Sequence, residues 1–494
     1  MNSFQPYAAG NCQPVKLSDI PLCEMPVLRE FTVRRVRDGA RIAGLCVVTA
    51  AGQRRLLVVL ADHKKSLIYL AWAAVANSYP AFTPVCAQAN LFEREIFEQF
   101  DIVPEGHPWL KPVRFSRADK KPVIGDTAFF SMSGEQVHEV AVGPVHAGII
   151  EPGHFRFQCT GEKVWHLEIS LGYQHRGVEA AIINGPDKKT LHYLETLCGD
   201  TTVGHALAYC HAIEALSGAQ VSLRAQVIRG IALELERLAN HTGDLGALAN
   251  DVAYLPTASY CGRLRGDFLN MTALICGNRF GRGLVKPGGV AGDLDAQTAG
   301  QLRQRLVKTF NDTKGAADLL FNTPSVLDRF EDTGIIAASV CQELGLVGPP
   351  ARACGLEQDS RRDFPYGVYS LVKMPVSAHT TGDVYARALL RWLEIKRSTD
   401  FIQGRLAGLR EGEISVCLGE AAKDSLVVSL VEGWRGPICH IIVTNNIGKI
   451  SNYKVIDPSF YNWLGLSLAT RGQQISDFPL CNKSFNLSYC GHDL

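Results

Sequence analysis

The feature that most restricts the fold is a long helical segment in the middle of the chain. Residues 229–254, RGIALELERLANHTGDLGALANDVAY, have helical patterning over their whole length. A helix of this length spans about 39 Å, enough to cross the interior of a domain. The same patterning dominates from about Leu191 to Ala253. The sequence therefore predicts a large, mainly helical domain around this segment.

Composition limits the class of protein. A chain of 494 residues is too long for one ordinary core, so we expect two or three domains. Lysine plus arginine (50) nearly balances aspartate plus glutamate (49), which argues against a nucleic-acid partner. Apolar runs such as residues 67–76 are too short to span a membrane. Residues 1–17 lack the features of a signal peptide, so we expect a cytoplasmic protein.

The fifteen cysteines are scattered along the chain, without the regular spacing of a disulfide scaffold. Most are expected to be buried thiols that act as small apolar side chains. No C-x-x-C pair occurs. This absence argues against zinc ribbons and iron–sulfur clusters, because both draw their thiolates largely from such pairs.

The first part of the chain predicts a small α/β domain. Residues 44–50 and 54–62 are apolar runs separated by a glycine-containing turn, the pattern of a β-hairpin. The next segment, residues 64–79, is predicted to be helical. In residues 92–100, three apolar side chains repeat at four-residue spacing among charged residues, which predicts a short amphipathic helix.

A charged connecting segment, residues 116–136, contains the expected domain boundary, with domains at residues 1–122 and 123–494. Residues 163–173 alternate apolar and polar side chains, which predicts a half-buried strand. Residues 426–458 predict short strands separated by turns. The expected fold class is α+β, an N-terminal α/β domain followed by a mainly helical domain.

Several motifs resemble known families, and they occur in the family order. FEREIFEQFDIVPEGHPWLK resembles the signature of the C-type, 30-kDa-class subunit of respiratory complex I. GPVHAGIIEPGHFRF, LGYQHRGVEAAI, ELERLANHTGD and GDVYARALLRWLEIKRS resemble the D-type, 49-kDa-class subunit and the large subunit of membrane-bound [NiFe] hydrogenases. The order of the two modules resembles the fused large subunit of the hydrogenase-4 and formate-hydrogenlyase type (group 4).

The hydrogenase resemblance implies four nickel-binding cysteines in two pairs. The first pair falls on Cys198 and Thr201, with the family histidine at His205. The second falls on Ser459 and Asn462. Three of the four thiolates are therefore replaced, and hydroxyl and amide groups do not substitute for thiolates on nickel. We expect these four positions to be vestigial and the chain to bind no metal.

The complex I resemblance implies a quinone site instead. It places the histidine that contacts the quinone headgroup at His154, an earlier family histidine at His146, and the aspartate that pairs with the headgroup histidine at Asp251. His154 and Asp251 are thus the candidate catalytic residues. The family tyrosine falls on Gly199, which has no proton donor. Without the resemblance, His154 is a loop histidine bonded to backbone, and Asp251 is a solvated residue or a cap.

Four charged residues in the family motifs are candidates to line the old metal cavity as ion pairs: Arg176, Glu179, Glu236 and Arg237. Because buried charges persist only when they are paired, a structural role is equally expected. In the C-terminal tail, Cys481, Cys490 and His492 suggest either a new metal site or a segment that docks against the cavity or a partner.

The resemblance implies an electron-transfer subunit of a membrane-associated complex on the inner face of the cell membrane. Its partners would be an iron–sulfur small subunit of the complex I B type, carrying a [4Fe-4S] cluster, a ferredoxin-like subunit and antiporter-like membrane subunits. The cavity would serve a quinone or proton coupling. Two alternatives are a non-catalytic scaffold of such a complex and an active [NiFe] hydrogenase or formate hydrogenlyase large subunit.

Overall fold

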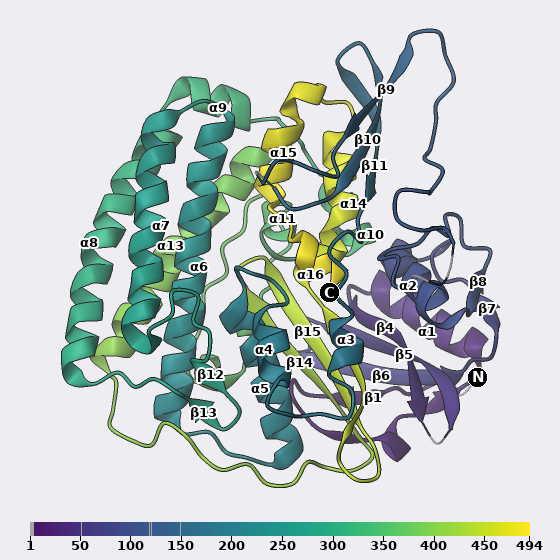
Figure 1. Cartoon of the computed structure of the whole chain (residues 1–494), viewed down its shortest axis with the longest axis horizontal. Coiled ribbons are helices and arrows are strands. Elements are labelled where there is room, and N and C mark those ends of the chain that lie inside the picture. Colours follow the sequence, from purple (N-terminus) through teal and green to yellow (C-terminus); the bar gives the residue numbers. More distant parts are fainter. Residues whose placement is uncertain (1–3, 51, 118, 120, 149) are drawn as a thin grey trace.

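The computed structural model describes residues 4–50, 52–117, 119, 121–148 and 150–494. Figure 1 shows an α/β domain at lower right, a central sheet, a layer of long helices at left and a smaller sheet at upper right. This arrangement confirms the expected fold class. The predicted boundary between residues 122 and 123 falls in a stretch without helix or strand among its described residues, and it stays a prediction.

The N-terminal sheet has the strand order β1-β6-β5-β4, with β3 beside β6. The elements of this domain are β1 (Tyr7–Ala9), β2 (Val15–Lys16), β3 (Leu22–Cys23), α1 (Met25–Arg37), β4 (Arg41–Ala50), β5 (Gln53–Asp62), β6 (Leu67–Ala74), β7 (Ser78–Pro80), α2 (Asn90–Phe100) and β8 (Val103–Glu105). The hairpin β4–β5 and the helix α2 confirm two predictions. The helix expected over residues 64–79 is wrong, because β6 occupies this segment. Nearly all of β6 is buried, so the strand lacks the alternation that distinguishes strands from helices.

The Glu-Arg-Glu motif on α2 holds this domain together and joins it to the second domain. Glu93 accepts two backbone N–H groups that precede α2, at 2.7 and 2.9 Å. Arg94 donates to two carbonyls of the loop that follows the helix. Glu95 pairs with Arg114 and, at 2.5 Å, with Lys454 of the second domain. The motif is therefore structural.

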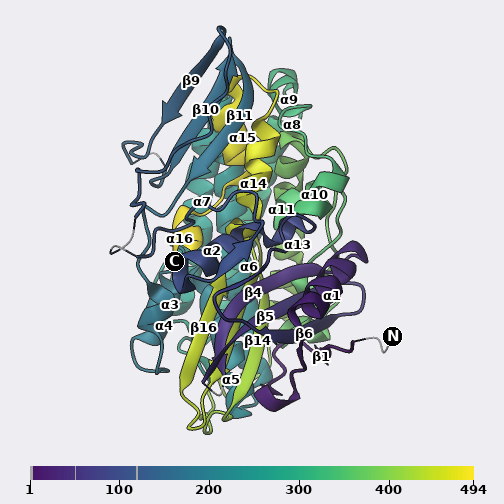
Figure 2. The same cartoon turned by 90° about the vertical axis from the view of Figure 1, so that its right-hand side faces the viewer.

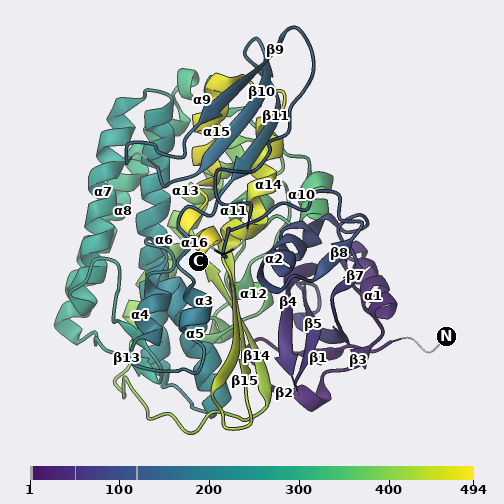
Figure 3. The same ribbon diagram turned by 45° about the vertical axis from the view of Figure 1, so that its right-hand side comes forward.

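The second domain is mainly helical. Its helices are α3 (Val178–Ala181), α4 (Thr190–Glu195), α5 (Thr202–Ser217), α6 (Leu223–Asp251), α7 (Leu255–Cys276), α8 (Ala296–Phe321), α9 (Pro324–Phe330), α10 (Ala338–Leu344), α11 (Gly348–Ala353), α12 (Ser360–Asp363), α13 (Val384–Ala407), α14 (Pro458–Thr470), α15 (Phe478–Phe485) and α16 (Tyr489–Asp493). The expected long helix is α6, which begins at a Ser222 cap whose hydroxyl accepts the Ala225 N–H. It packs against α7 and α13, and Figures 1 and 3 show these helices side by side with α8. Because α6 lies inside the layer, most of its residues are buried.

The central sheet lies between the helical layer and the N-terminal domain. Its strands are β14 (Ser425–Gly433), β15 (Gly436–Thr444) and β16 (Ile450–Ile456), as predicted, and β2 extends it in the order β16-β15-β14-β2. A second sheet, β9 (Val137–Val142), β10 (His154–Thr160) and β11 (Lys163–Ser170), extends from the body in Figure 2. The short strands β12 (Val285–Lys286) and β13 (Gly289–Val290) form a separate pair. Within the described ranges, no helix combines the length and apolar character of a membrane span.

Candidate functional site

The four positions expected to be vestigial ligands are buried at the starts of two helices. Cys198 lies in the turn before α5, and Thr201 directly precedes the first residue of that helix. Ser459 and Asn462 lie near the start of α14. Asp457 caps α14 by accepting the N–H of Ser459 at 2.8 Å. The two helix starts thus carry all four side chains.

A guanidinium and a carboxylate occupy the polar region beside the first pair. Arg435 donates to both oxygens of Asp200, at 2.5 and 2.8 Å, and its Nη1 lies 3.3 Å from the Cys198 Sγ and 3.4 Å from the Thr201 Oγ1. Burial alone would raise the pKa of Asp200, but the charge and hydrogen bonds of Arg435 lower this pKa to about 2. The indole of Trp434 donates to the Thr201 Oγ1 at 3.1 Å. Thr201 is therefore held by hydrogen bonds from Trp434 and Arg435.

The C-terminal tail joins the two former ligand pairs. The Ser488 N–H donates to the Ser459 Oγ at 2.8 Å, and the Cys198 thiol donates to the Ser488 Oγ at 3.0 Å. The Cys490 Sγ lies 3.4 Å from the same hydroxyl. The terminal residue, Leu494, is buried. The tail thus docks beside the positions that the resemblance assigns to metal ligands, one of the two locations expected for it.

The residues present do not fit a nickel–iron centre. Of the four positions, only Cys198 carries sulfur, and its hydrogen bond with Cys490 together with burial raises its pKa well above the usual value. Both groups of the Asn462 amide bond to the backbone of Val347, at 3.0 and 3.1 Å. Soft, redox-active metals require several thiolates, and this set offers one protonated thiol.

A buried hydrogen-bonded chain begins at Asp457. Its Oδ2 lies 3.1 Å from the His205 Nε2, the His205 Nδ1 lies 3.1 Å from the His440 Nε2, and the His440 Nδ1 lies 2.8 Å from the Tyr453 Oη. Burial, with a contribution from His205, lowers the pKa of His440 well below its usual value, so this imidazole is neutral. All three hydrogen bonds form when Tyr453 donates to His440, His440 to His205, and His205 to Asp457. These hydrogen bonds all run in one direction, from Tyr453 towards Asp457, because the Asp457 carboxylate is an acceptor.

Glu236 lies on α6 and contacts the N-terminus of α5. Its carboxylate accepts the N–H groups of Val203 and Gly204, at 2.7 and 3.2 Å, and burial raises its pKa to about 8. The pocket beside it, lined by Asp200 and Asn240 among others, has a volume of about 10 Å³. Such a volume holds about one water molecule and no quinone headgroup.

The candidate catalytic residues make their contacts separately. The His154 Nδ1 donates to the Gly143 carbonyl at 3.2 Å, and its Nε2 accepts from Arg156 at 3.3 Å, so both ring nitrogens are engaged. Burial lowers the pKa of His154. Asp251 ends α6, where burial raises its pKa and the charge of Lys483 opposes the increase. Across the described residues, no hydrogen bond or ion pair joins His154 to Asp251.

The other two positions from the quinone comparison are likewise separate from His154 and Asp251 in their contacts. The His146 Nε2 bonds to the Gly153 carbonyl at 2.8 Å. Gly199 is exposed, and a Cβ at this position would meet no atom within 4 Å. An apolar pocket of about 200 Å³ between β11, α14 and the loop after α2 has His492 of the tail in its lining, but none of the residues expected from the quinone comparison.

Each charged residue expected to line the cavity has at least one partner outside its own motif. Arg176 donates to two carbonyls just before Cys198, both at 2.8 Å. Glu179 pairs with Lys454 at 3.0 Å. Arg237 pairs with Glu234 at 3.1 Å and with Glu394 at 3.3 Å. Arg176 therefore holds the former metal loop from outside, and Glu179 belongs to the contact between domains.

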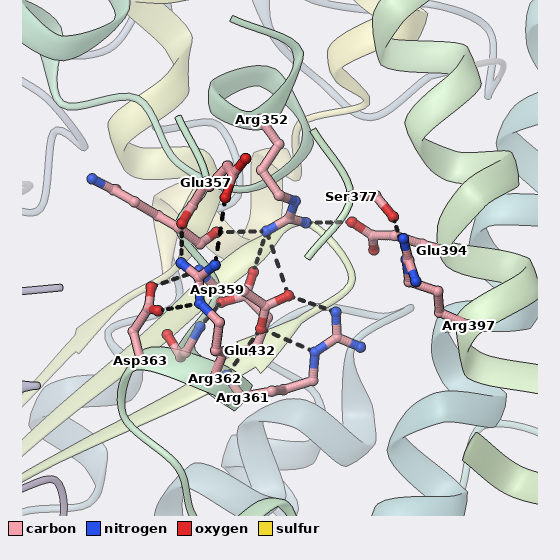
Figure 4. A network of polar contacts seen from close by, with 12 residues as sticks. Arg352, Glu357, Asp359, Arg361, Arg362, Asp363, Ser377, Glu394, Arg397 and Glu432 are labelled. Atoms are coloured by element: carbon pink, nitrogen blue, oxygen red, sulfur yellow. Dashed lines mark hydrogen bonds and ion pairs between the residues drawn. The ribbon is translucent and has the colours of Figure 1, made fainter. Parts of the chain in front are cut away.

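Arg237 belongs to a buried ion network, part of which is shown in Figure 4. Arg352 donates to Glu432 at 2.8 Å and to Glu394 at 2.6 Å, and Arg361 donates to Asp359 at 2.6 Å. These residues come from α11, α12, α13 and β14 and the residue before α12. Each charge has an opposite partner, as burial requires, so the network locks the helical layer to the central sheet.

Two family descriptions match this chain: respiratory-chain NADH dehydrogenase, 30 Kd subunit, over residues 32–120, and the 49 Kd subunit over residues 251–423. The chain is also 30% identical over 350 residues to the carbon monoxide-induced hydrogenase of Rhodospirillum rubrum, which covers 71% of this chain and 97% of that protein. It belongs to the complex I and group 4 hydrogenase large-subunit family.

Other relatives come from both branches of this family. Formate hydrogenlyase subunit 5 of Escherichia coli strain K12 is 28% identical over 432 residues, covering 83% of this chain and 76% of that protein. NADH-quinone oxidoreductase subunit 4 of Thermus thermophilus is 28% identical over 369 residues, covering 69% of this chain and 90% of that protein. The four former-ligand positions lie outside both ranges matched by the family descriptions.

Sequence reasoning missed four residues that complete this site: Arg435, His440, Tyr453 and Ser488. His440 carried a usable signal, since an ionisable side chain interrupts the apolar run of the strand β15. Arg435 and Ser488 lie in a turn and a tail, where an exposed position is the ordinary expectation.

Proposed function

We propose that this chain is the electron-transfer large subunit of a membrane-associated complex related to hydrogenase-4 and complex I, in which hydrogen chemistry has been lost. The donor set at the former ligand positions carries the proposal: one protonated thiol, two hydroxyls and an amide bound to backbone. Electrons would come from a [4Fe-4S] cluster in a B-type small subunit. A ferredoxin-like subunit and antiporter-like membrane subunits would complete the assembly on the inner face of the membrane.

The former metal region would handle protons rather than a quinone. The chain from Asp457 through His205 and His440 to Tyr453 supports this role, because each link is a hydrogen bond through which a proton can pass. A proton entering at Tyr453 would cause each imidazole to accept a proton on one nitrogen and release one from the other. Asp457 would receive the last proton, and the direction of the hydrogen bonds would reverse. Burial raises the pKa of Tyr453 well above its usual value, so this end of the chain holds a proton at rest. The engaged nitrogens of His154 argue against an ordinary quinone headgroup, as does the absence of a donor at residue 199.

A scaffold role is the second candidate, and the docked tail favours it. Ser488 and Cys490 occupy hydrogen-bonding positions beside Cys198 that a substrate would otherwise use. In that case the subunit would hold the small subunit against its membrane partners without chemistry of its own.

The loss of hydrogen chemistry is tested on the purified complex. We expect far less than one nickel atom per chain by elemental analysis and no hydrogen uptake with oxidised methyl viologen as acceptor. Nickel at one atom per chain, together with hydrogen turnover, would contradict the proposal.

The proton role is tested by His440→Gln in the assembled complex. When reduced methyl viologen supplies electrons to the complex, we expect the accompanying proton uptake to slow at least about tenfold. The glutamine amide cannot relay a proton between His205 and Tyr453 as the imidazole can. His63→Gln is the matched control, since His63 is also buried and bonds Asp363 at 2.8 Å outside this chain of groups. Equal proton uptake in both variants, with intact assembly, would favour the scaffold.

A further inference from the structure

We propose that Cys198 and Cys490 form a redox-active dithiol that closes to a disulfide between the C-terminal tail and the former metal loop. One hydroxyl, the Ser488 Oγ, lies 3.0 Å from the Cys198 Sγ and 3.4 Å from the Cys490 Sγ. The same hydroxyl thus contacts both sulfurs. The surviving member of the old metal pair has thus gained a new sulfur neighbour from a distant part of the chain.

The tail segment that carries Cys490 is firmly anchored. The Ser488 N–H donates to the Ser459 Oγ, and the Gly491 N–H donates to the Ser488 Oγ at 2.9 Å. The Leu494 carbonyl accepts two backbone N–H groups of the turn before α3, at 2.9 and 3.1 Å. These contacts on both sides of Cys490 keep its sulfur beside Cys198 in the folded protein.

The two sulfurs differ in access and in surroundings. Cys490 is partly exposed, so a small oxidant reaches it, whereas Cys198 is 1% exposed. The Cys198 Sγ lies 3.0 Å from the Asp200 Oδ1, and the Arg435 guanidinium at 3.3 Å stabilises a developing thiolate. Cys490 is therefore the residue that reacts first, and Cys198 is the resolving thiol.

A second thiol pair provides a comparison within the same chain. Cys341 and Cys354 are close enough for each to shift the pKa of the other, but both are buried. Proximity alone is therefore shared by both pairs, and access to solvent distinguishes the proposed one.

The chemistry balances with hydrogen peroxide as the two-electron oxidant. The Cys490 sulfur attacks one peroxide oxygen and the O–O bond breaks. The other oxygen departs as water, and Cys490 becomes a sulfenic acid. The Cys198 sulfur then attacks the Cys490 sulfur, the S–O bond breaks, and the departing hydroxide leaves as water with the Cys198 proton. Two thiols and one peroxide thus give one disulfide and two water molecules. A dithiol reductant reverses the step by thiol–disulfide exchange.

The test uses the full-length reduced protein, treated with hydrogen peroxide while folded and then digested without reducing agent. We expect a linked Cys198–Cys490 peptide pair that increases with peroxide, an intact mass lower by about 2 Da, and reversal by dithiothreitol. In Cys198→Ser, the resolving thiol is gone, so dimedone should trap Cys490 sulfenic acid several-fold more than in the unsubstituted protein. Cys354→Ser is the matched control and should leave the Cys198–Cys490 link unchanged.

Three results would overturn the proposal, and the first two need no substitution. One is a Cys490 that stays reduced at peroxide concentrations that oxidise the exposed Cys417. Another is a link that is as abundant in urea-unfolded protein as in folded protein. The third is dimedone labelling of Cys490 to the same extent with and without Cys198.

Discussion

At the scale of single residues, the four positions that the resemblance assigns to metal ligands form a hydrogen-bonded arrangement in this structure. Thr201 accepts from Trp434, and Asn462 bonds both ways to the backbone of Val347. Each new side chain has hydrogen-bond partners because a buried polar group without one is costly. The substitutions therefore belong to a stable polar arrangement.

Glu236 gives a pH-dependent prediction. Its pKa is about 8 in the folded protein and 4.5 as the ordinary value, so between these pH values the folded protein holds a proton that the unfolded chain has released. The stability contributed by this group is complete below pH 4.5 and is lost as the pH rises towards 8. We would measure urea unfolding from pH 4.5 to 9. The unfolding free energy of Glu236→Gln, relative to that of the unsubstituted protein, should rise with pH by at most about 5 kcal/mol and become constant above about pH 8.

The matched control is Glu135→Gln, which removes an exposed carboxylate. Its stability difference from the unsubstituted protein should stay constant over the same pH range. A flat difference for Glu236→Gln as well would show that Glu236 is ionised in the folded protein at neutral pH.

At the scale of elements, the helix α16 of the tail fits against the cap of α14. A Cβ added to Gly491 would lie 2.7 Å from the Asp457 Cγ and 2.9 Å from the Ser488 Oγ. Because Asp457 is fixed by His205 and by the Ser459 N–H, it has little freedom to move away. The tail is thus packed as closely as an ordinary core element.

Gly491→Ala should therefore destabilise the protein by about 1–3 kcal/mol, measured by chemical unfolding. It should also increase labelling of Cys198 by a maleimide, because the tail that covers this thiol is displaced. Gly404→Ala is the control, since no atom lies within 4 Å of a Cβ there and alanine favours the helix α13. Equal stability of the two variants would mean that the tail is loosely docked.

Elements with a clear period could be predicted from the sequence, whereas the buried apolar run of β6 was assigned to the wrong type of element. The amphipathic helix α2 and the half-buried strand β11 were predicted because one face of each is polar. The strand β6 was predicted to be a helix, because an apolar run buried on both faces has no period to distinguish the two. Its true identity depends on pairing with β5, which no local pattern contains.

At the scale of the whole molecule, the two domains share a buried charged contact. Glu95 from the first domain and Glu179 from the second both pair with Lys454, at 2.5 and 3.0 Å. Burial lowers the pKa of Lys454 to about 8, and Glu179 opposes this effect. Removing the lysine would leave two carboxylates short of positive charge in a region of low dielectric.

Lys454→Ala should therefore cost about 3–5 kcal/mol of unfolding free energy. The double variant Lys454→Ala with Glu179→Ala should recover part of this loss, because it also removes the carboxylate that the first change leaves unpaired. Chemical unfolding of the two single variants and the double variant measures both effects. Strict additivity of the two single changes would contradict a coupled contact.

The tertiary fold of the whole molecule explains why the candidate site could be predicted only in part. The resemblance to a family placed Cys198, Thr201, Ser459 and Asn462, since these positions lie in recognisable motifs. The tail residues Ser488 and Cys490 reach them only through the tertiary fold, 290 positions from Cys198 in the case of Ser488. No spacing rule connects residues so far apart, so the filling of the site could not be derived from the sequence.

The pairing of β2 with β14 has a consequence for the timing of synthesis. Just before β2, the Asn11 side chain donates to the Leu430 carbonyl at 2.9 Å and accepts its N–H at 2.8 Å, across a separation of 419 positions. At bacterial or eukaryotic elongation rates, a ribosome needs roughly 20–80 s to add that many residues. The β2 segment therefore waits for its partner strand until β14 has been translated. Translation speed thus sets the earliest moment at which the central sheet can be completed.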